Sequence, residues 1–135
     1  MTIRLVVDTN VLISAVLTPN GPAAEVLLIA LQQPDFQLCI SGAVYAEYEE
    51  VIRRPRFQRS ESEIESILAY IRDQSRWVKP TTSVQACSDP RDDIFLECAA
   101  AADAQYLVTG NTRHFPPFWA ETQIITPRQF LETVA

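Results

Sequence analysis

Short apolar runs rich in β-branched residues alternate with longer segments of helical periodicity, and this alternation most constrains the fold. The run Ile3–Val7 is apolar apart from Arg4, which is typical of a strand buried in a parallel sheet. Similar runs predict strands at Phe36–Ile40 and at residues 77–78, 105–109 and 123–125. Strands that alternate with helices favour a mostly parallel sheet, because each crossover helix returns the chain to the same edge.

The segments between the predicted strands carry helix start signals. Ser41 and Ser60 are expected N-caps, and the second begins a capping box with Glu63. Asp89-Pro90 and Thr126-Pro127 each place a capping residue before a proline. Helices are predicted at residues 11–17, 23–31, 42–53, 61–74, 90–103 and from 127 onward. The chain has 135 residues, 47% of them hydrophobic, so we expect one domain (1–135) of the three-layer α/β/α class.

Charge and glycine content exclude several classes of function. The net charge of −6 argues against a protein that coats nucleic acid. It still allows an enzyme that acts on nucleic acid through a small basic patch and a bound metal ion. Only three glycines are present, so neither a dinucleotide-binding GxGxxG loop nor a Walker A loop can be built.

The cysteines and the N-terminus predict a location in the cytoplasm, away from membranes. Cys39, Cys87 and Cys98 are odd in number and widely spaced, which fits free thiols in a reducing compartment. The chain begins without the pattern of a signal peptide, and no apolar run approaches the ~20 residues of a membrane span.

Two acidic residues stand at positions where chemistry is expected. Ligands of parallel sheets bind at the carboxyl ends of the strands, and Asp8 directly follows the first strand. A lone aspartate there also fits a helix cap. Glu47 shares a helix face with Val44, Tyr48 and Val51, which is the apolar face. The alternative is that Glu47 lies at the edge of this face and reaches water.

A further pair of acids opens the helix predicted after Pro90. Asp92 lies on the same face as the apolar residues Phe95, Leu96 and Ala99, whereas Asp93 lies beside that face. Acids in a first turn are also favoured by the helix dipole alone. The periodicity favours Asp92 as the functional residue and leaves Asp93 possible, because helix starts are uncertain by a few residues.

Asp8, Glu47 and Asp92 together map to one edge of the predicted sheet. Carboxylates gathered there would repel one another and raise each other's pKa, unless a cation lay between them. Mg²⁺ and Mn²⁺ prefer such oxygen ligands. His114 is the only histidine and has no positioned cysteine partner, which argues against zinc.

A cluster of arginines follows the Glu47 helix. Its members are Arg53, Arg54, Arg56 and Arg59. Clusters of this kind are often just a solvated surface. The functional interpretation is a rim that binds phosphate groups near the acidic pocket, because guanidinium groups bind phosphate in a bidentate manner.

Four motifs, taken in order, resemble those of PIN domains. Residues 6–15 (VVDTNVLISA) resemble the opening motif, and Ser41-x-x-Val44-x-x-Glu47 resembles the second. Residues 89–96 (DPRDDIFL) resemble the third motif and residues 107–111 (LVTGN) the fourth. The resemblance spans about residues 3–133, and the branch it is most similar to contains the VapC-like toxins of bacterial toxin–antitoxin pairs.

This resemblance implies a five-stranded sheet in the order 3-2-1-4-5. It also implies a Mg²⁺- or Mn²⁺-dependent ribonuclease that forms a homodimer and is inhibited by a cognate antitoxin protein. Asp8, Glu47 and the Asp92/Asp93 pair match the metal-binding acids of the family. Four residues would orient these ligands or bound water: Thr9, Asn10, Ser41 and Thr109.

The chain departs from the family pattern in the fourth motif. Asn111 stands where an acid is common, and His114 stands where related toxins often carry another acid. Asn111 can offer an amide oxygen to a metal ion but brings no charge. We therefore expect a site with one negative charge fewer and weaker affinity for a second ion.

The leading hypothesis is metal-dependent hydrolysis of RNA phosphodiester bonds. An alternative is a PIN-like module that binds RNA or a protein without cutting. A phosphotransfer enzyme of the haloacid-dehalogenase or receiver type is disfavoured, because the first strand ends in Asp8-Thr9-Asn10 rather than Asp-x-Asp. The only lysine, Lys79, also does not stand where such sites require one.

Overall fold

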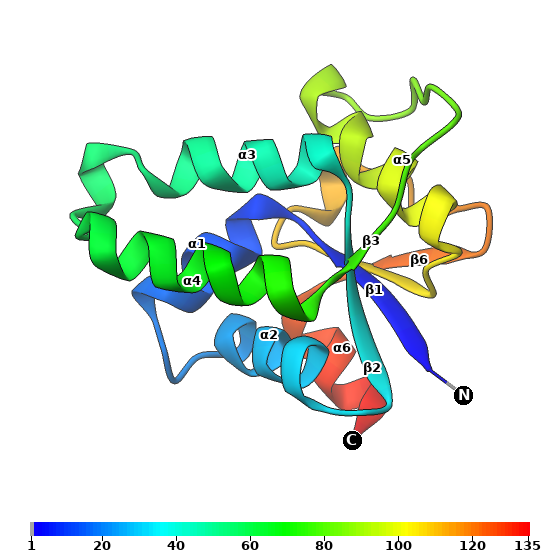
Figure 1. Ribbon diagram of the computed structural model, residues 1–135. Helices are drawn as coiled ribbons and strands as arrows, with labels where there is room; N and C mark the ends of the chain where they lie inside the picture. Colours follow the sequence, from blue (N-terminus) through cyan, green and yellow to red (C-terminus); the bar gives the residue numbers. More distant parts are fainter. Residues whose placement is uncertain (1) are drawn as a thin grey trace.

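The computed structural model describes residues 2–135, which form one sheet with helices α2 and α6 on one side and α5 on the other (Figure 1). The strands are β1 (Ile3–Val7), β2 (Phe36–Ile40), β3 (Arg76–Trp77), β4 (Tyr106–Val108), β5 (Phe118–Trp119) and β6 (Thr122–Ile125). Their order is β3-β2-β1-β4-β6-β5, and every neighbouring pair is parallel except β5 with β6. The predicted α/β class with a mostly parallel sheet is confirmed.

The prediction of five strands was wrong by one. The five predicted strands occur in the expected order, as β3-β2-β1-β4-β6, but β5 adds a short antiparallel edge. Its connection to β6 passes through Ala120 with a φ of 52°. Glycine usually occupies such a turn position, so the sequence carries no turn signal there.

The helices begin largely where the capping residues predicted. They are α1 (Thr9–Leu17), α2 (Pro22–Gln32), α3 (Gly42–Ile52), α4 (Glu61–Gln74), α5 (Asp93–Ala102) and α6 (Pro127–Val134). Ser41 Oγ accepts a hydrogen bond from the Val44 N–H, and Ser60 Oγ accepts one from the Glu63 N–H. Thr126 forms a capping box with Gln129. These caps determine the residues at which α3, α4 and α6 begin.

The helix predicted from Pro90 to residue 103 is divided. A 3₁₀ turn, η2 (Pro90–Asp92), comes first, and α5 begins only at Asp93. The cause is local, because Asp89 Oδ1 accepts a hydrogen bond from the Arg91 N–H at 3.0 Å and closes the tight turn. Asp92 and Asp93 consequently belong to different elements.

Three neighbouring strands end at the same edge of the sheet. The last residues of β1 are fully buried and central, between β2 and β4. The chain leaves β1 at Asp8, β2 at Ser41 and β4 at Thr109, and all three polar residues are buried. The fold thus brings polar side chains to one buried edge.

Within residues 2–135, Cys39, Cys87 and Cys98 are free thiols, as predicted. No single helix in this range is long and apolar enough to cross a membrane. Helices α1 and α2 meet that test only as a pair, with a bend of 108° between them.

Candidate functional site

A polar cavity of about 440 Å³ opens at the carboxyl edge of the sheet. Its walls come from the β1–α1 junction, one face of α3, and the 3₁₀ turns η1 (Pro55–Phe57), η2 and η3 (Thr112–His114). The ionisable residues that line it are Asp8, Glu47, Asp89, Asp92, Arg54, Arg56, Arg91 and His114. Segments far apart in sequence thus meet around one hollow.

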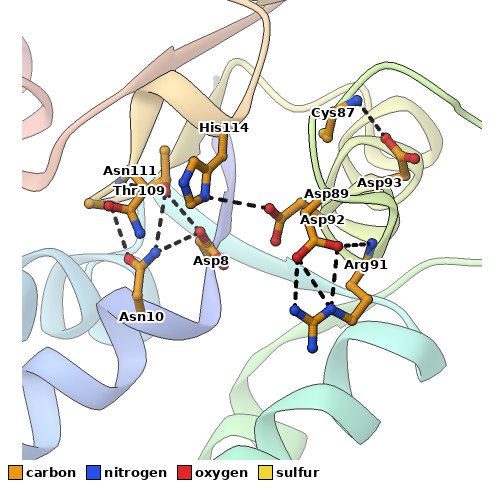
Figure 2. A network of polar contacts seen from close by, with 11 residues as sticks. Asp8, Asn10, Cys87, Asp89, Arg91, Asp92, Asp93, Thr109, Asn111 and His114 are labelled. Carbon is orange, nitrogen blue, oxygen red and sulfur yellow. Dashed lines mark hydrogen bonds and ion pairs between the residues drawn. The ribbon is translucent and has the colours of Figure 1, made fainter.

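Asp8 is the most enclosed acid of the cavity, with 6% of its surface exposed. Its side chain makes no cap to α1. Instead its Oδ2 accepts hydrogen bonds from Thr109 Oγ1 and Asn10 Nδ2, each at 2.8 Å (Figure 2). Burial raises the pKa of Asp8 to about 6, with help from the charges of Asp92 and Glu47 and against the Thr109 hydrogen bond.

The residues around Asp8 are themselves fixed by hydrogen bonds. Asn10 Oδ1 accepts from the Gly110 N–H at 2.9 Å, and Thr109 Oγ1 accepts from the Asn111 N–H at 3.0 Å. A Cβ atom at Gly110 would lie 3.2 Å from Asn10 Oδ1, so the glycine allows the close approach. Asp8 is therefore locked in one orientation.

Glu47 lies on the face of α3 that lines the cavity, together with Val51, and Arg54 lines the cavity from just beyond the end of that helix. It is half-buried beside the buried residue Tyr48, at the edge of the apolar face. Thr9 Oγ1 donates a hydrogen bond to Glu47 Oε2 at 2.7 Å. The start of α1 thus holds a second carboxylate near Asp8.

Asp92 also lines the cavity, from the end of η2, but it is held more loosely. Its side chain is 21% exposed, and Oδ2 lies 3.7 Å from His114 Nδ1 (Figure 2). Burial raises the pKa of Asp92, and the negative charges of Asp89 and Glu47 raise it further, against the influence of His114.

Asp93 does not line the cavity, although the sequence left it open as a ligand. Its Oδ1 accepts hydrogen bonds from the N–H groups of Ala86 at 3.1 Å and Cys87 at 2.9 Å. Burial raises the pKa of Asp93, but these N–H groups outweigh it and hold the pKa below its usual value. Asp93 therefore anchors the loop before η2.

The donor set fits a hard divalent cation in its chemistry. Asp8, Glu47 and Asp92 supply carboxylate oxygens around one cavity, and Asn111 adds an amide oxygen. Burial is the main cause of the raised pKa of Asp8, and the charges of Asp92 and Glu47 add to it; a cation would relieve this repulsion. Across residues 2–135, no three Asp, Glu, His or Cys side chains converge as a preformed ion site. Side chains must turn inward for three of them to contact one ion.

The predicted arginine rim separates into different environments. Arg54 and Arg56 line the cavity. Arg53 is held by ion pairs to Glu49 at 3.1 Å and Glu61 at 2.8 Å, outside the cavity. Arg59 lines a different, apolar groove between α1, α2 and α4, where its Nε is buried without a hydrogen-bond partner. Two of the four predicted arginines thus face the acids.

Sequence reasoning did not name Arg91 as a site residue, and it considered His114 only as an improbable zinc ligand and a departure from the family pattern. Both residues line the cavity. Arg91 lines the cavity from η2 and is paired with Asp89 at 2.9 Å. Its position between two acids of one motif was the available signal. Ser41, predicted to orient ligands, instead caps α3 and does not line the cavity, so it acts on Glu47 only through the helix.

Comparisons with known proteins agree with this architecture. The family model described as "PIN domain" matches residues 4–113. An uncharacterized protein of Methanocaldococcus jannaschii is 25% identical over 142 residues, covering 96% of this chain and 90% of that protein.

Two solved structures share the fold over most of both chains. The structure of VapBC-1 from nontypeable Haemophilus influenzae gives a TM-score of 0.63 at 15% identity, covering 93% of this chain and 99% of that one. VapBC2 from Rickettsia felis, bound to a DNA fragment from their promoter, gives 0.60 at 13% identity, covering 92% and 98%.

Proposed function

This chain belongs to the PIN domain family, and we propose that it is a metal-dependent ribonuclease, the toxin of a toxin–antitoxin pair. The observation that carries this proposal is that three carboxylates, Asp8, Glu47 and Asp92, line one cavity that arginines also line. Acids alone would repel RNA, and arginines alone would only bind it. Their combination suits cleavage of a phosphodiester bond.

The acids would hold Mg²⁺ or Mn²⁺, one or two ions, with Asn111 as a neutral oxygen donor. When bound, such an ion stabilises the negative charge that grows on the phosphate oxygens during in-line attack by water. Asn111 brings no charge, so we expect the affinity for a second ion to be the weaker one.

The other residues of the cavity position these groups. Thr109 and Asn10 hold Asp8 through Oδ2, and Thr9 holds Glu47. Fixed donors of this kind keep ligands in place before substrate arrives. Arg54, Arg56 and Arg91 would attract the phosphates and draw RNA to an otherwise acidic protein.

The test is cleavage of labelled RNA by the purified chain with Mn²⁺, with Mg²⁺ and with EDTA. We expect cutting that requires the metal ion and is lost in Asp8→Asn. Asp35→Asn is the matched control, because Asp35 is exposed and directly precedes β2 at the opposite edge of the sheet. Full activity in Asp8→Asn would falsify the assignment.

The alternative is a PIN-like module that binds RNA or a protein without cutting. The absence of a preformed three-acid cluster among residues 2–135 favours this alternative, as does Asn111 in an acid position. The same assay separates the two functions. A binding module retains RNA in a gel-shift experiment but leaves it intact with either metal ion.

We infer an antitoxin partner from the two VapBC structures that share this fold. An apolar groove of about 490 Å³ between α1, α2 and α4 supports a protein partner, since Leu28 and Tyr70 are 51% and 40% exposed there. A small open reading frame adjacent to the gene, whose product co-purifies with the chain, is the expected result. The resemblance also proposes a homodimer, which sedimentation of the purified chain would test.

A further inference from the structure

The cavity changes character along α3. Glu47 and Val51 line it from one face of α3, and Arg54 lines it from the residues between α3 and η1. Val51 lies four residues, about 6 Å, along the helix from Glu47, and the chain continues past it to Arg54 and η1, which form the basic end of the cavity. Ile13 and Val51 add apolar surface to the lining.

An arginine and an aromatic ring are paired at that basic end. The Arg56 guanidinium carbon lies 4.9 Å from the centroid of the Phe57 ring, and both residues line the cavity from η1. Arg53 and Arg54 have glutamate partners. Arg56 forms no ion pair with any residue in the described range, and it is exposed. The ring therefore supports a planar cation that is free to bind.

We propose that Arg56 and Phe57 form a stacking subsite for the nucleobase next to the bond that is cut, with Arg54 on the neighbouring phosphate. The inference rests on the proposed ribonuclease function and names the substrate as unpaired RNA. Guanidinium planes and aromatic rings both accept the face of a base, and Arg56 adds charge to that contact. Bases inside a duplex are stacked on each other and cannot reach such a surface.

The test compares two ligands and measures equilibrium binding by fluorescence anisotropy. One ligand is a short, unstructured oligoribonucleotide, and the other is an abasic ribose-phosphate chain of the same length. The full chain is used at low salt with EDTA, so that nothing is cut. Three variants are compared with wild type, namely Arg56→Lys, Arg56→Gln and Phe57→Leu. Arg53→Gln is the matched control, because that arginine lies outside the cavity.

The variants should separate stacking from charge. Arg56→Lys keeps the charge but removes the plane, so RNA affinity should fall about tenfold while the abasic chain binds as to wild type. Phe57→Leu should behave in the same way, since Arg56 loses its support. Arg56→Gln should weaken the binding of both ligands. The salt dependence of its binding should correspond to about one phosphate contact fewer than in wild type.

Other outcomes overturn the subsite or the function itself. If wild type cuts RNA but Arg56→Lys weakens neither ligand, or weakens both equally, the subsite is wrong. If wild type neither binds nor cuts RNA, the ribonuclease proposal fails first and the subsite fails with it.

Discussion

The two walls of the cavity are built differently. On the sheet wall, which is the end of β1 with the residues that follow β4, Asp8 is buried, and two donors fix its Oδ2 at 2.8 Å. On the helix wall, where η2 lines the cavity, Asp92 is partly exposed, and its Oδ2 lies 3.7 Å from His114 Nδ1. The first carboxylate is held by two hydrogen bonds and the second has one longer contact, and Figure 2 draws both.

This contrast explains how an acidic cavity can exist without a preformed cluster. Rigid carboxylates in mutual contact would repel each other and destabilise the fold. Burial raises the pKa of Asp8 to about 6, and the charges of Asp92 and Glu47 contribute a smaller part of that rise. We infer that the sheet wall supplies the fixed ligand and that the helix wall adjusts when a cation arrives.

The largest expected effect separates the neighbours Asp92 and Asp93. Asp92→Asn removes a carboxylate from the cavity and should lower cleavage roughly a thousandfold, with little change in stability. Asp93→Asn weakens the acceptor for two N–H groups and should lower the free energy of unfolding by about 1–3 kcal/mol. Urea titration and cleavage per folded molecule check both results, and the reverse pattern would exchange the roles of the two residues.

The next effect concerns the pH dependence of stability. Burial raises the pKa of Asp8 from 3.8 to about 6 in the folded state. The unfolded chain therefore loses this proton at a lower pH than the folded protein, and above about pH 6 the ionised Asp8 destabilises the folded state by up to about 3 kcal/mol. Relative to Asp8→Asn, wild type should lose stability as pH rises from about 4 to about 6 and change little above that. Urea titrations of both proteins across this range measure it, and parallel curves would contradict the rigid, buried carboxylate.

A smaller effect tests how the sheet wall is fixed. Thr109→Val keeps the shape of a fully buried side chain but removes the donor to Asp8. We expect cleavage to fall about tenfold. The pKa of Asp8 should rise further, because the Thr109 hydrogen bond lowers it. A pH–rate profile with an unchanged acidic limb would show that Thr109 does not position Asp8.

The smallest effect comes from an arginine outside both walls. Arg53→Gln removes exposed ion pairs with Glu49 and Glu61, which contribute little to stability. Its Tm and its cleavage rate should match those of wild type. A large loss of cleavage would show that the surface that binds RNA extends beyond the cavity to Arg53.

The sequence predicted the sheet wall well because backbone topology determines it. Asp8 and Thr109 follow parallel strands directly, and such strands end at one edge whatever the side chains do. Glu47 was predicted from helical periodicity after a correctly identified cap at Ser41. Local signals were enough for these positions.

The helix wall was harder to predict because it depends on a turn and a loop rather than on a regular helix. Periodicity favoured Asp92, which lines the cavity, but left Asp93 open. The two are separated by a 3₁₀ turn and by the N–H groups of Ala86 and Cys87, which lie in a loop without periodicity. Arg59 resembles Arg56 in sequence context, yet it lies in another groove, and between them Gln58 has a left-handed backbone with a φ of 51°.

The most direct test of the central claim is calorimetric titration of Mn²⁺ into wild type, Asp8→Asn, Asp92→Asn and Asp93→Asn. We predict that wild type and Asp93→Asn bind the ion alike. Asp8→Asn should lose the binding and Asp92→Asn should weaken it, because the fixed ligand matters more than the adjustable one. Equal binding by Asp8→Asn and wild type would contradict the account, because the ion would then be held without the carboxylate that the sheet fixes.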